Sequence, residues 1–153
     1  MTQPDRASHF RARRRIEFYE TDMAGIVHFS NYFRFMESTE HAFFRSLGLA
    51  LHSDDGKHMS GWARVGARCE YRLPLHYMDE VEIELTVRAK SRSSLAYDFV
   101  FRRIADRDGP TPPDEVALGT LEVVHVTQAP GGRMKASAMP DEVDARVHAA
   151  PSV

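Results

Sequence analysis

The chain has 153 residues, a length that fits one domain with a single core and leaves little room for a second. Hydrophobic residues make up 42% of it and charged residues 27%, a globular composition that excludes a chain disordered throughout. A formal net charge of -2 gives no strong basic field, so we expect no nucleic-acid partner.

Cys69 is the only cysteine, so an intramolecular disulfide is impossible and a reducing, cytoplasmic setting is the simplest expectation. Its alternation with Ala67 and Tyr71 is typical of a strand and favours a packed core thiol over a nucleophile. Residues 1–9 lack the apolar stretch of a signal peptide. Nowhere do about 18 apolar residues follow one another, so we expect no integral membrane segment.

A strand is the first element that the sequence predicts. Residues 1–9 are polar and are expected to form a flexible N-terminus. From Phe10, apolar and charged residues alternate, and this period of two predicts a strand that ends near Glu20. The following Thr21–Gly25 breaks the alternation, since Gly25 gives the backbone freedom to turn.

A long helix follows this break. Ser30 or Asn31 is a suitable N-cap, and apolar residues then recur at spacings of three and four until Gly48, a residue that often ends helices. We therefore predict a helix of about five turns over Asn31–Leu47. Its apolar surface is broad enough to be wrapped by a sheet. The main stripe consists of Tyr32, Met36, Thr39, Phe43 and Leu47.

Strands account for most of the remaining chain. The clearest covers residues 81–87, where aliphatic residues alternate with glutamate and threonine. Residues 106–114 contain a glycine and three prolines, and we expect a long turn without regular structure there. Residues 129–153 predict a polar C-terminal tail. Further strands are expected over residues 62–73, 95–101 and 116–126, after a loop over residues 51–60.

The order of these elements is one strand, one long helix and four strands, which predicts a single α+β domain over residues 10–128. Strands that follow one another without intervening helices pair antiparallel. A five-stranded antiparallel sheet wrapped around the long central helix would bury the aromatic residues between Tyr32 and Phe44.

Asp22 is the residue with the clearest chemical potential, because it lies just before Gly25 and the start of the helix. The first backbone N–H groups of a helix have no partner of their own, and with the helix dipole they favour negative charge. A thioester carbonyl placed there could develop its oxyanion against them while the carboxylate attacks it or activates water. By itself, an aspartate before a helix is more often a turn or capping residue.

The stretch Ile16–Tyr32, which reads IEFYETDMAGIVHFSNY, resembles the signature of the 4-hydroxybenzoyl-CoA thioesterase family. It is also similar to the acyl-CoA thioesterases associated with the Tol–Pal system. The matching order is an acidic residue, a variable residue, the aspartate, two residues, a glycine, two aliphatic residues and an aromatic pair before Asn-Tyr. The resemblance is close over Arg15–Leu49 and then covers the strand order and the phrase Arg92–Leu95. It implies a hotdog fold and hydrolysis of an aryl or short to medium acyl-CoA, which is the substrate, with no bound cofactor.

The resemblance assigns roles to residues around the break. Asp22 matches the family's catalytic aspartate, which acts as nucleophile or general base. Phe29 holds the position whose backbone N–H stabilises the oxyanion. His28 stands where the family often has tyrosine or tryptophan, and we expect it to be a wall of the acyl pocket. Glu20 replaces the more usual aspartate and keeps the charge on a longer arm.

The turn after residues 81–87 carries Lys90, Arg92 and Ser93. As a bare pattern it is a solvated hairpin turn, although lysine and arginine also suit phosphate. The resemblance implies that these residues contact the phosphates of coenzyme A, with Arg92 in the best matching position. It further implies a homodimer or homotetramer whose active site lies at the interface between two protomers.

Three alternatives stay open. Glu40, on the predicted helix, is a second candidate catalyst, since another subgroup of hotdog thioesterases places its catalytic carboxylate there. A non-catalytic acyl-CoA-binding hotdog module would keep the basic turn and the aromatic pocket but would not need Asp22. A hotdog dehydratase or hydratase needs a carboxylate and a histidine a few residues apart, which Asp22 and His28 superficially offer. The histidines show no compact metal-ligand spacing, so no bound metal is expected.

Overall fold

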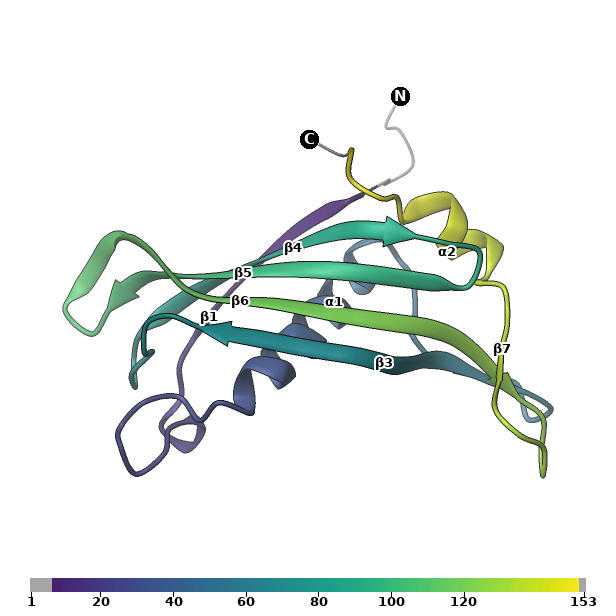
Figure 1. Ribbon diagram of the computed structural model, residues 1–153, viewed down its shortest axis with the longest axis horizontal. Coiled ribbons are helices and arrows are strands. Elements are labelled where there is room, and N and C mark those ends of the chain that lie inside the picture. Colours follow the sequence, from purple (N-terminus) through teal and green to yellow (C-terminus); the bar gives the residue numbers. More distant parts are fainter. Residues whose placement is uncertain (1–6, 152–153) are drawn as a thin grey trace.

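A curled antiparallel sheet surrounds one long helix in the computed structural model of this protein, which describes residues 7–151 (Figure 1). The strand order is β1-β4-β5-β6-β3-β2, and β7 pairs with β6. A sheet wrapped around a central helix is the α+β arrangement that the sequence predicts. The elements are β1 (His9–Arg15), the 3-10 helix η1 (Phe18–Glu20), α1 (Asn31–Ser46), β2 (Ser53–Asp54), β3 (Met59–Tyr71), β4 (Glu80–Lys90), β5 (Ser94–Asp106), β6 (Gly109–Gln128), β7 (Lys135–Ala136) and α2 (Asp141–Arg146).

Five long strands make up most of this sheet, as predicted, and the two-residue strands β2 and β7 extend it to seven in the described part of the chain. Each outward arginine of β1 stands opposite a glutamate of β4, which neutralises the basic run near the N-terminus. The ion pairs are Arg11–Glu84 at 2.8 Å, Arg13–Glu82 at 3.5 Å and Arg15–Glu80 at 3.2 Å.

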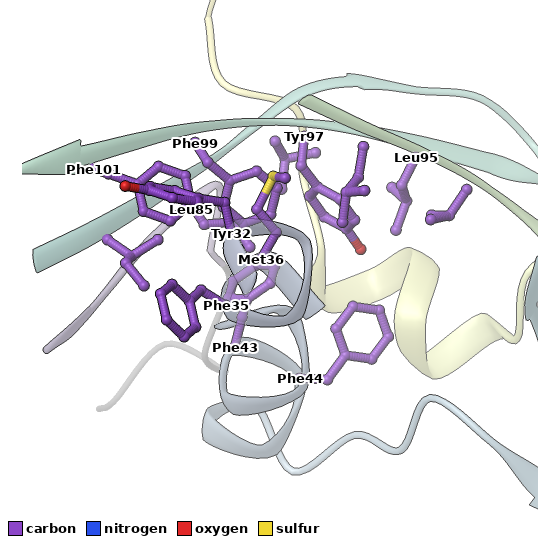
Figure 2. Packing of buried hydrophobic residues seen from close by; sticks show 14 of the residues in the cluster. Tyr32, Phe35, Met36, Phe43, Phe44, Leu85, Leu95, Tyr97, Phe99 and Phe101 are labelled. Carbon is purple, nitrogen blue, oxygen red and sulfur yellow. The ribbon is translucent and has the colours of Figure 1, made fainter. Parts of the chain in front are cut away.

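The core lies between the inner face of the sheet and one side of α1 (Figure 2). All five residues of the predicted helical stripe are buried, so the predicted orientation of the helix is confirmed. Gly119 of β6 faces Met36, and a Cβ atom at this position would collide with the Met36 sulfur. The missing side chain therefore lets the helix approach the sheet closely. Tyr97, Phe99 and Phe101 of β5 complete the aromatic part of the core.

The prediction of a long irregular turn over residues 106–114 is wrong. Strand β5 continues to Asp106 and β6 begins at Gly109, so only two residues form the turn of this hairpin. The prolines are tolerated because β6 pairs with β3 only from Ala117 onward. The first part of β6, residues 109–115, pairs with β5 alone, and a proline without an N–H group costs no hydrogen bond on the unpaired side.

The prediction that the domain ends at residue 128 and a polar tail follows is also wrong, because β7 and α2 pack onto the rest of the molecule. Met139, Val143 and Val147 recur every four residues and are buried in the main core cluster. These apolar residues pack an otherwise polar segment onto the core, and composition alone hid this pattern.

The N-terminal prediction falls partly outside the described residues, since residues 1–6 are not described. Ala7 pairs with Val147 in an isolated parallel bridge, and His9 already belongs to β1. The expected flexible segment therefore does not extend to residue 9. Across the part of the chain that the structure describes, none of the helices combines the length and apolar character needed to span a bilayer.

Candidate active site

Asp22 lies in a tight hairpin between η1 and α1. Its N–H donates to the Ile26 carbonyl at 2.8 Å, and Thr21 pairs with Val27 across the hairpin. Gly25 has a φ of 82°, the left-handed conformation that closes a three-residue loop of this kind. The segment is therefore a defined turn, and it fixes the backbone position from which the Asp22 side chain extends.

The Asp22 carboxylate keeps one oxygen free. Its Oδ1 accepts a hydrogen bond from the Ala24 N–H at 2.8 Å, whereas Oδ2 has no donor among residues 7–151. The side chain is half-exposed and forms no ion pair with the described residues. A carboxylate in this state can attack an electrophile or accept a proton from water.

Glu20 ties the hairpin to the helix. Its carbonyl oxygen accepts hydrogen bonds from the His28 N–H at 2.9 Å and from the Asn31 side-chain amide at 2.8 Å. Its carboxylate is buried and pairs with Arg14, whose guanidinium carbon lies 4.1 Å from the centre of the Phe35 ring. The longer side chain of glutamate at this position therefore forms an ion pair with Arg14 beneath the hairpin.

The backbone of Phe29 presents a free donor just before α1. Its N–H has no acceptor among residues 7–151, while its carbonyl accepts a hydrogen bond from the Tyr71 hydroxyl at 2.8 Å. The first turn of α1 begins two residues later and adds the positive end of the helix dipole. A ligand oxygen that carries negative charge would be stabilised at this amide.

Asp22 and Phe29 border the same cleft, which has a volume of about 390 Å³. The end of β3 and the segment after it supply the opposite wall, and Arg72 is the one basic side chain in the lining. The rest of the wall is largely apolar, which suits the acyl part of a thioester. The other lining residues are Ile26, Val27, Tyr32, Tyr71, Leu73 and Pro74.

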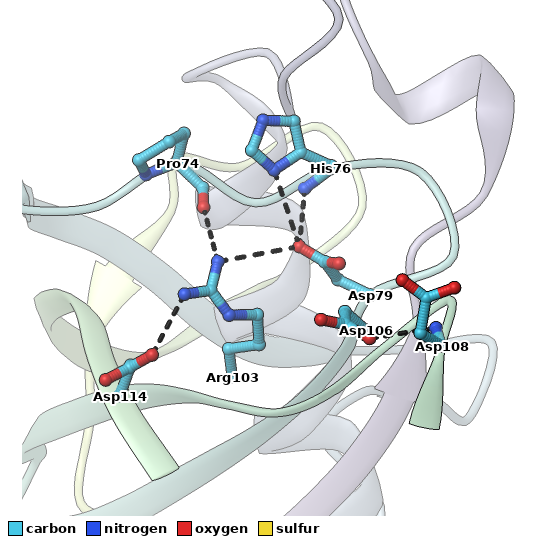
Figure 3. A network of polar contacts seen from close by, with 7 residues as sticks. All are labelled: Pro74, His76, Asp79, Arg103, Asp106, Asp108 and Asp114. Carbon is cyan, nitrogen blue, oxygen red and sulfur yellow. Dashed lines mark hydrogen bonds and ion pairs between the residues drawn. The ribbon is translucent and has the colours of Figure 1, made fainter. Parts of the chain in front are cut away.

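A polar network holds the wall that follows β3 (Figure 3). Arg103 of β5 donates to the Pro74 carbonyl at 3.3 Å and to the Asp114 carboxylate at 2.9 Å. The buried Asp79 lies 3.9 Å from the same guanidinium and accepts a hydrogen bond from the His76 N–H at 2.8 Å. These contacts anchor residues 74–79 to the sheet and keep the cleft wall in place.

His28 is exposed and is not among the residues that line the cleft. Its ring stacks on the Phe29 ring with the centroids 4.6 Å apart, and its Nδ1 hydrogen-bonds with the Ser30 hydroxyl at 2.8 Å. Within one protomer these contacts support the Phe29 side chain.

The residues predicted to contact coenzyme A lie at the opposite end of the sheet from Asp22 (Figure 1). Ile26 of the Asp22 hairpin pairs with His76, shortly before β4 begins. Lys90 is the last residue of β4, and Arg92 and Ser93 follow it. Eleven extended residues separate the two ends by roughly 33 Å. One protomer therefore does not bring these residues to the Asp22 cleft.

Lys90 is occupied by contacts within the protomer. Its Nζ donates to the carbonyls of Asp144 and Val147 at 2.7 and 3.0 Å, where it holds the end of α2. The Ser93 carbonyl accepts a hydrogen bond from a backbone N–H of β6. Arg92 is exposed and forms no ion pair with any described residue, so its guanidinium, unlike the Lys90 ammonium, is available to a phosphate.

Glu40, the alternative catalyst, is fully buried in the middle of α1 and does not line the Asp22 cleft. It pairs with Arg64 of β3 at 2.6 Å. Cys69 is half-buried, and this burial raises the pKa of its thiol to about 11. Within residues 7–151, no group of three or more His, Cys, Asp or Glu side chains is arranged to hold a metal ion.

Sequence reasoning missed the part that Tyr71 plays in this cleft. The hydroxyl that contacts the Phe29 carbonyl comes from a residue 42 positions away along the chain. Its one signal was the alternation with Cys69 and Ala67, which places Tyr71 on the same inner face of β3.

Comparison with known proteins gives consistent matches. Residues 16–147 match the family model described as "Thioesterase-like superfamily". A "Putative esterase" of Aquifex aeolicus (strain VF5) is 40% identical over 90 residues, which cover 58% of this chain and 68% of that protein. The 1,4-dihydroxy-2-naphthoyl-CoA hydrolase of Prochlorococcus marinus (strain NATL2A) is 28% identical over 116 residues, which cover 71% and 75% of the two chains.

Solved structures agree with the fold. The 4-hydroxybenzoyl CoA thioesterase from Pseudomonas sp. strain CBS-3 superimposes with a TM-score of 0.75 at 22% identity. The match covers 90% of this chain and 99% of that one. At this identity the likeness concerns the fold alone, and it confirms the predicted hotdog arrangement.

Proposed function

Because the chain belongs to the thioesterase-like superfamily, we propose that it is an acyl-CoA thioesterase that hydrolyses an aryl or short to medium acyl-CoA. The observation that supports this most strongly is one largely apolar cleft lined by both Asp22 and Phe29. Among residues 7–151, one oxygen of the Asp22 carboxylate has no donor and the Phe29 N–H has no acceptor. Relatives named as a 1,4-dihydroxy-2-naphthoyl-CoA hydrolase and a 4-hydroxybenzoyl CoA thioesterase suggest an aryl group as the first to test.

In the proposed reaction the thioester carbonyl oxygen accepts a hydrogen bond from the Phe29 N–H, which stabilises the oxyanion as it forms. Asp22 then acts in one of two ways. It attacks the carbonyl carbon to form a mixed anhydride, from which the thiolate of coenzyme A leaves and which water later hydrolyses. Alternatively it takes a proton from a water molecule that attacks directly. Both routes yield the free acid and coenzyme A.

We further propose that the working unit is a homodimer, or a homotetramer of two dimers, formed through β3. This strand is an edge of the sheet, and only Met59 and Ser60 pair with the short β2. Its remaining backbone groups are a template for a second strand. Antiparallel pairing with a second copy would lay the partner's β4–β5 turn near the Asp22 cleft, where an exposed arginine at position 92 could meet the phosphates of coenzyme A.

Catalysis by Asp22 is tested by following free thiol release from a panel of aryl and short to long acyl-CoAs. Asp22→Asn should lose most of the rate and remain folded. Asp54→Asn is a matched control, because Asp54 also accepts a backbone N–H two residues on, from Gly56 at 2.9 Å, but lies outside the cleft.

Two results would overturn this assignment. Wild type that binds acyl-CoA without hydrolysing any of the panel would favour the non-catalytic binding module. An active Asp22→Asn variant would remove Asp22 as the catalyst and direct attention to Glu40. The dehydratase alternative loses support from the position of His28, which does not line the cleft.

A further inference from the structure

Tyr71 connects the end of β3 to the start of the helix. Its hydroxyl donates to the Phe29 carbonyl at 2.8 Å, and the edge of its ring packs on Tyr32 of α1 with centroids 5.0 Å apart. It lines the same cleft as Asp22. No other side chain among residues 7–151 hydrogen-bonds to the backbone of Phe29.

The two peptide groups that flank the Phe29 Cα atom are held separately. The first contains the Phe29 N–H and the His28 carbonyl, and that carbonyl accepts a hydrogen bond from the Asn31 N–H at 2.9 Å. Because a peptide group is planar, this bond points the Phe29 N–H the opposite way. The second peptide group contains the Phe29 carbonyl, which accepts the Tyr71 hydroxyl, and the Ser30 N–H, which donates to His28 Nδ1 at 3.2 Å. Tyr71 is the anchor of this group that comes from another element. Because the two groups share the Phe29 Cα atom, a shift of the second group also moves the first and its free N–H.

Tyr71 is a permanent donor in this arrangement. Burial, followed by the neighbouring Cys69 thiol, raises the pKa of its phenol to about 12. The hydroxyl consequently keeps its proton throughout the neutral range, and the bond to Phe29 does not change with pH there. Its ring contact with Tyr32 does not involve the hydroxyl, so the two contributions can be separated by mutation.

Building on the proposed function, we propose that Tyr71 is a positioning residue, whose hydroxyl fixes the Phe29 backbone so that its N–H is aimed at the thioester oxygen. The residue does not itself need to touch the reacting atoms. An oxyanion donor stabilises the transition state only when it is held in the correct direction before charge develops. The hydroxyl therefore acts on the chemical step and leaves substrate binding unchanged.

Tyr71→Phe tests this directly, because it retains the ring and removes the hydroxyl. We expect kcat to fall roughly tenfold, as a fraction of the loss that follows removal of a whole oxyanion donor, while KM stays within twofold. The rate should fall by the same factor between pH 6 and 9, since the phenol does not titrate there. Tyr77→Phe is the matched control, because its exposure of 47% is close to the 44% of Tyr71 and it lies outside the Asp22 cleft.

A second readout needs no substrate. In Tyr71→Phe the backbone order parameter of the Phe29 amide, measured by NMR relaxation, should drop relative to wild type and to Tyr77→Phe. An unchanged kcat and an unchanged order parameter would overturn the inference. A rise in KM alone would make Tyr71 a pocket wall, which also overturns it.

The two proposals fail in different ways. Wild type that hydrolyses no thioester removes the proposed function, and the amide measurement then still decides whether Tyr71 orders Phe29. Active wild type, inactive Asp22→Asn and fully active Tyr71→Phe would remove the role of Tyr71 alone.

Discussion

Two carboxylates near helix α1 have opposite environments. Asp22 lies in the hairpin before the helix, half-exposed, with one oxygen bonded to a backbone N–H and no cation beside it. Glu40 lies in the middle of the helix with 0% exposure, beside the guanidinium of Arg64 and the hydroxyl of Tyr97. The contrast teaches that burial with a cation makes a carboxylate part of the structure, whereas a fixed but open carboxylate is available for chemistry.

A β-bulge produces the pair of the buried Glu40 and the partly exposed Arg64. The register between β3 and β6 shifts between Arg64 and Gly66, so that Val65 has no opposite residue. Strict alternation inward from Ala67 would have turned Val65 toward the helix and Arg64 toward the outer face. The extra residue reverses this, which leaves Val65 exposed and brings Arg64 to Glu40.

The largest expected effect is the difference in kcat between variants of the two carboxylates. Asp22→Asn should lower kcat by about 10²–10⁴-fold, because it removes the attacking or proton-accepting oxygen. Glu40→Gln keeps the shape of its side chain and should change kcat by less than about fivefold, since Glu40 does not line the cleft. Steady-state thiol release under saturating acyl-CoA measures both. A Glu40→Gln variant as inactive as Asp22→Asn, yet folded, would reverse the assignment.

The next effect concerns stability. Arg64→Met leaves Glu40 buried without a cation and should lower the free energy of unfolding by about 3–5 kcal/mol. Urea denaturation followed by circular dichroism measures this. Arg88→Met is the control, because Arg88 pairs only with exposed carboxylates and should cost less than about 1 kcal/mol.

The double variant Glu40→Met with Arg64→Met sharpens the same comparison. Replacing both charges by apolar side chains should recover most of the lost stability, since no unpaired charge is left in the core. If the double variant is as unstable as Arg64→Met, the loss comes from packing around Arg64, and the view of Glu40 as a charge held by its partner is incorrect.

A smaller effect tests the hairpin that fixes Asp22. Gly25→Ala should cost about 1–2 kcal/mol, because the residue keeps a left-handed φ although its Cβ atom would meet nothing within 4 Å. Gly56→Ala has the same φ of 82° and the same open space, so its cost in stability should match. Only Gly25→Ala should also lower kcat. Equal kcat for the two variants would mean that the turn does not position Asp22.

The smallest effect concerns Cys69. It lies on the inner face of β3, between Arg64, the partner of Glu40, and Tyr71 in the Asp22 cleft. The folded protein holds the thiol proton more tightly than the unfolded chain, since burial raises the pKa to about 11. Stability should therefore be highest below the ordinary thiol pKa and fall as the pH rises from there toward 11. Relative to Cys69→Ala, the loss should not exceed about 1 kcal/mol once solvent screening is counted. Parallel stability curves for the two proteins between pH 7.5 and 10.5 would contradict this.

What could be predicted from the sequence depended on how local the cause was. The helix and the long strands were predictable because their apolar periods lie within each segment. The pairing of Asp22 with Phe29 was predicted from the resemblance to the thioesterase signature, which the seven positions between them leave within one short stretch. The proline-rich hairpin was not, because whether a proline costs a hydrogen bond depends on which strand lies beside it.

The other features that could not be predicted are contacts between segments far apart in the chain. The bond from Tyr71 spans 42 positions, and the one from Lys90 to the Asp144 carbonyl spans 54. A lysine in a hairpin turn gives no sign in the sequence that it will hold a distant helix, and so its use within the protomer could not be foreseen. The ion pair of the buried Glu40 with Arg64 depends on the bulge at Val65, which no period of two predicts.

The bridge between Ala7 and Val147 has a consequence for handling the protein. It holds the first and the last described segments side by side near α2 (Figure 1), and the Asp22 hairpin follows the other end of β1. A short linker could therefore join these segments in a circularly permuted gene, with new ends opened in the exposed loop around Gly56.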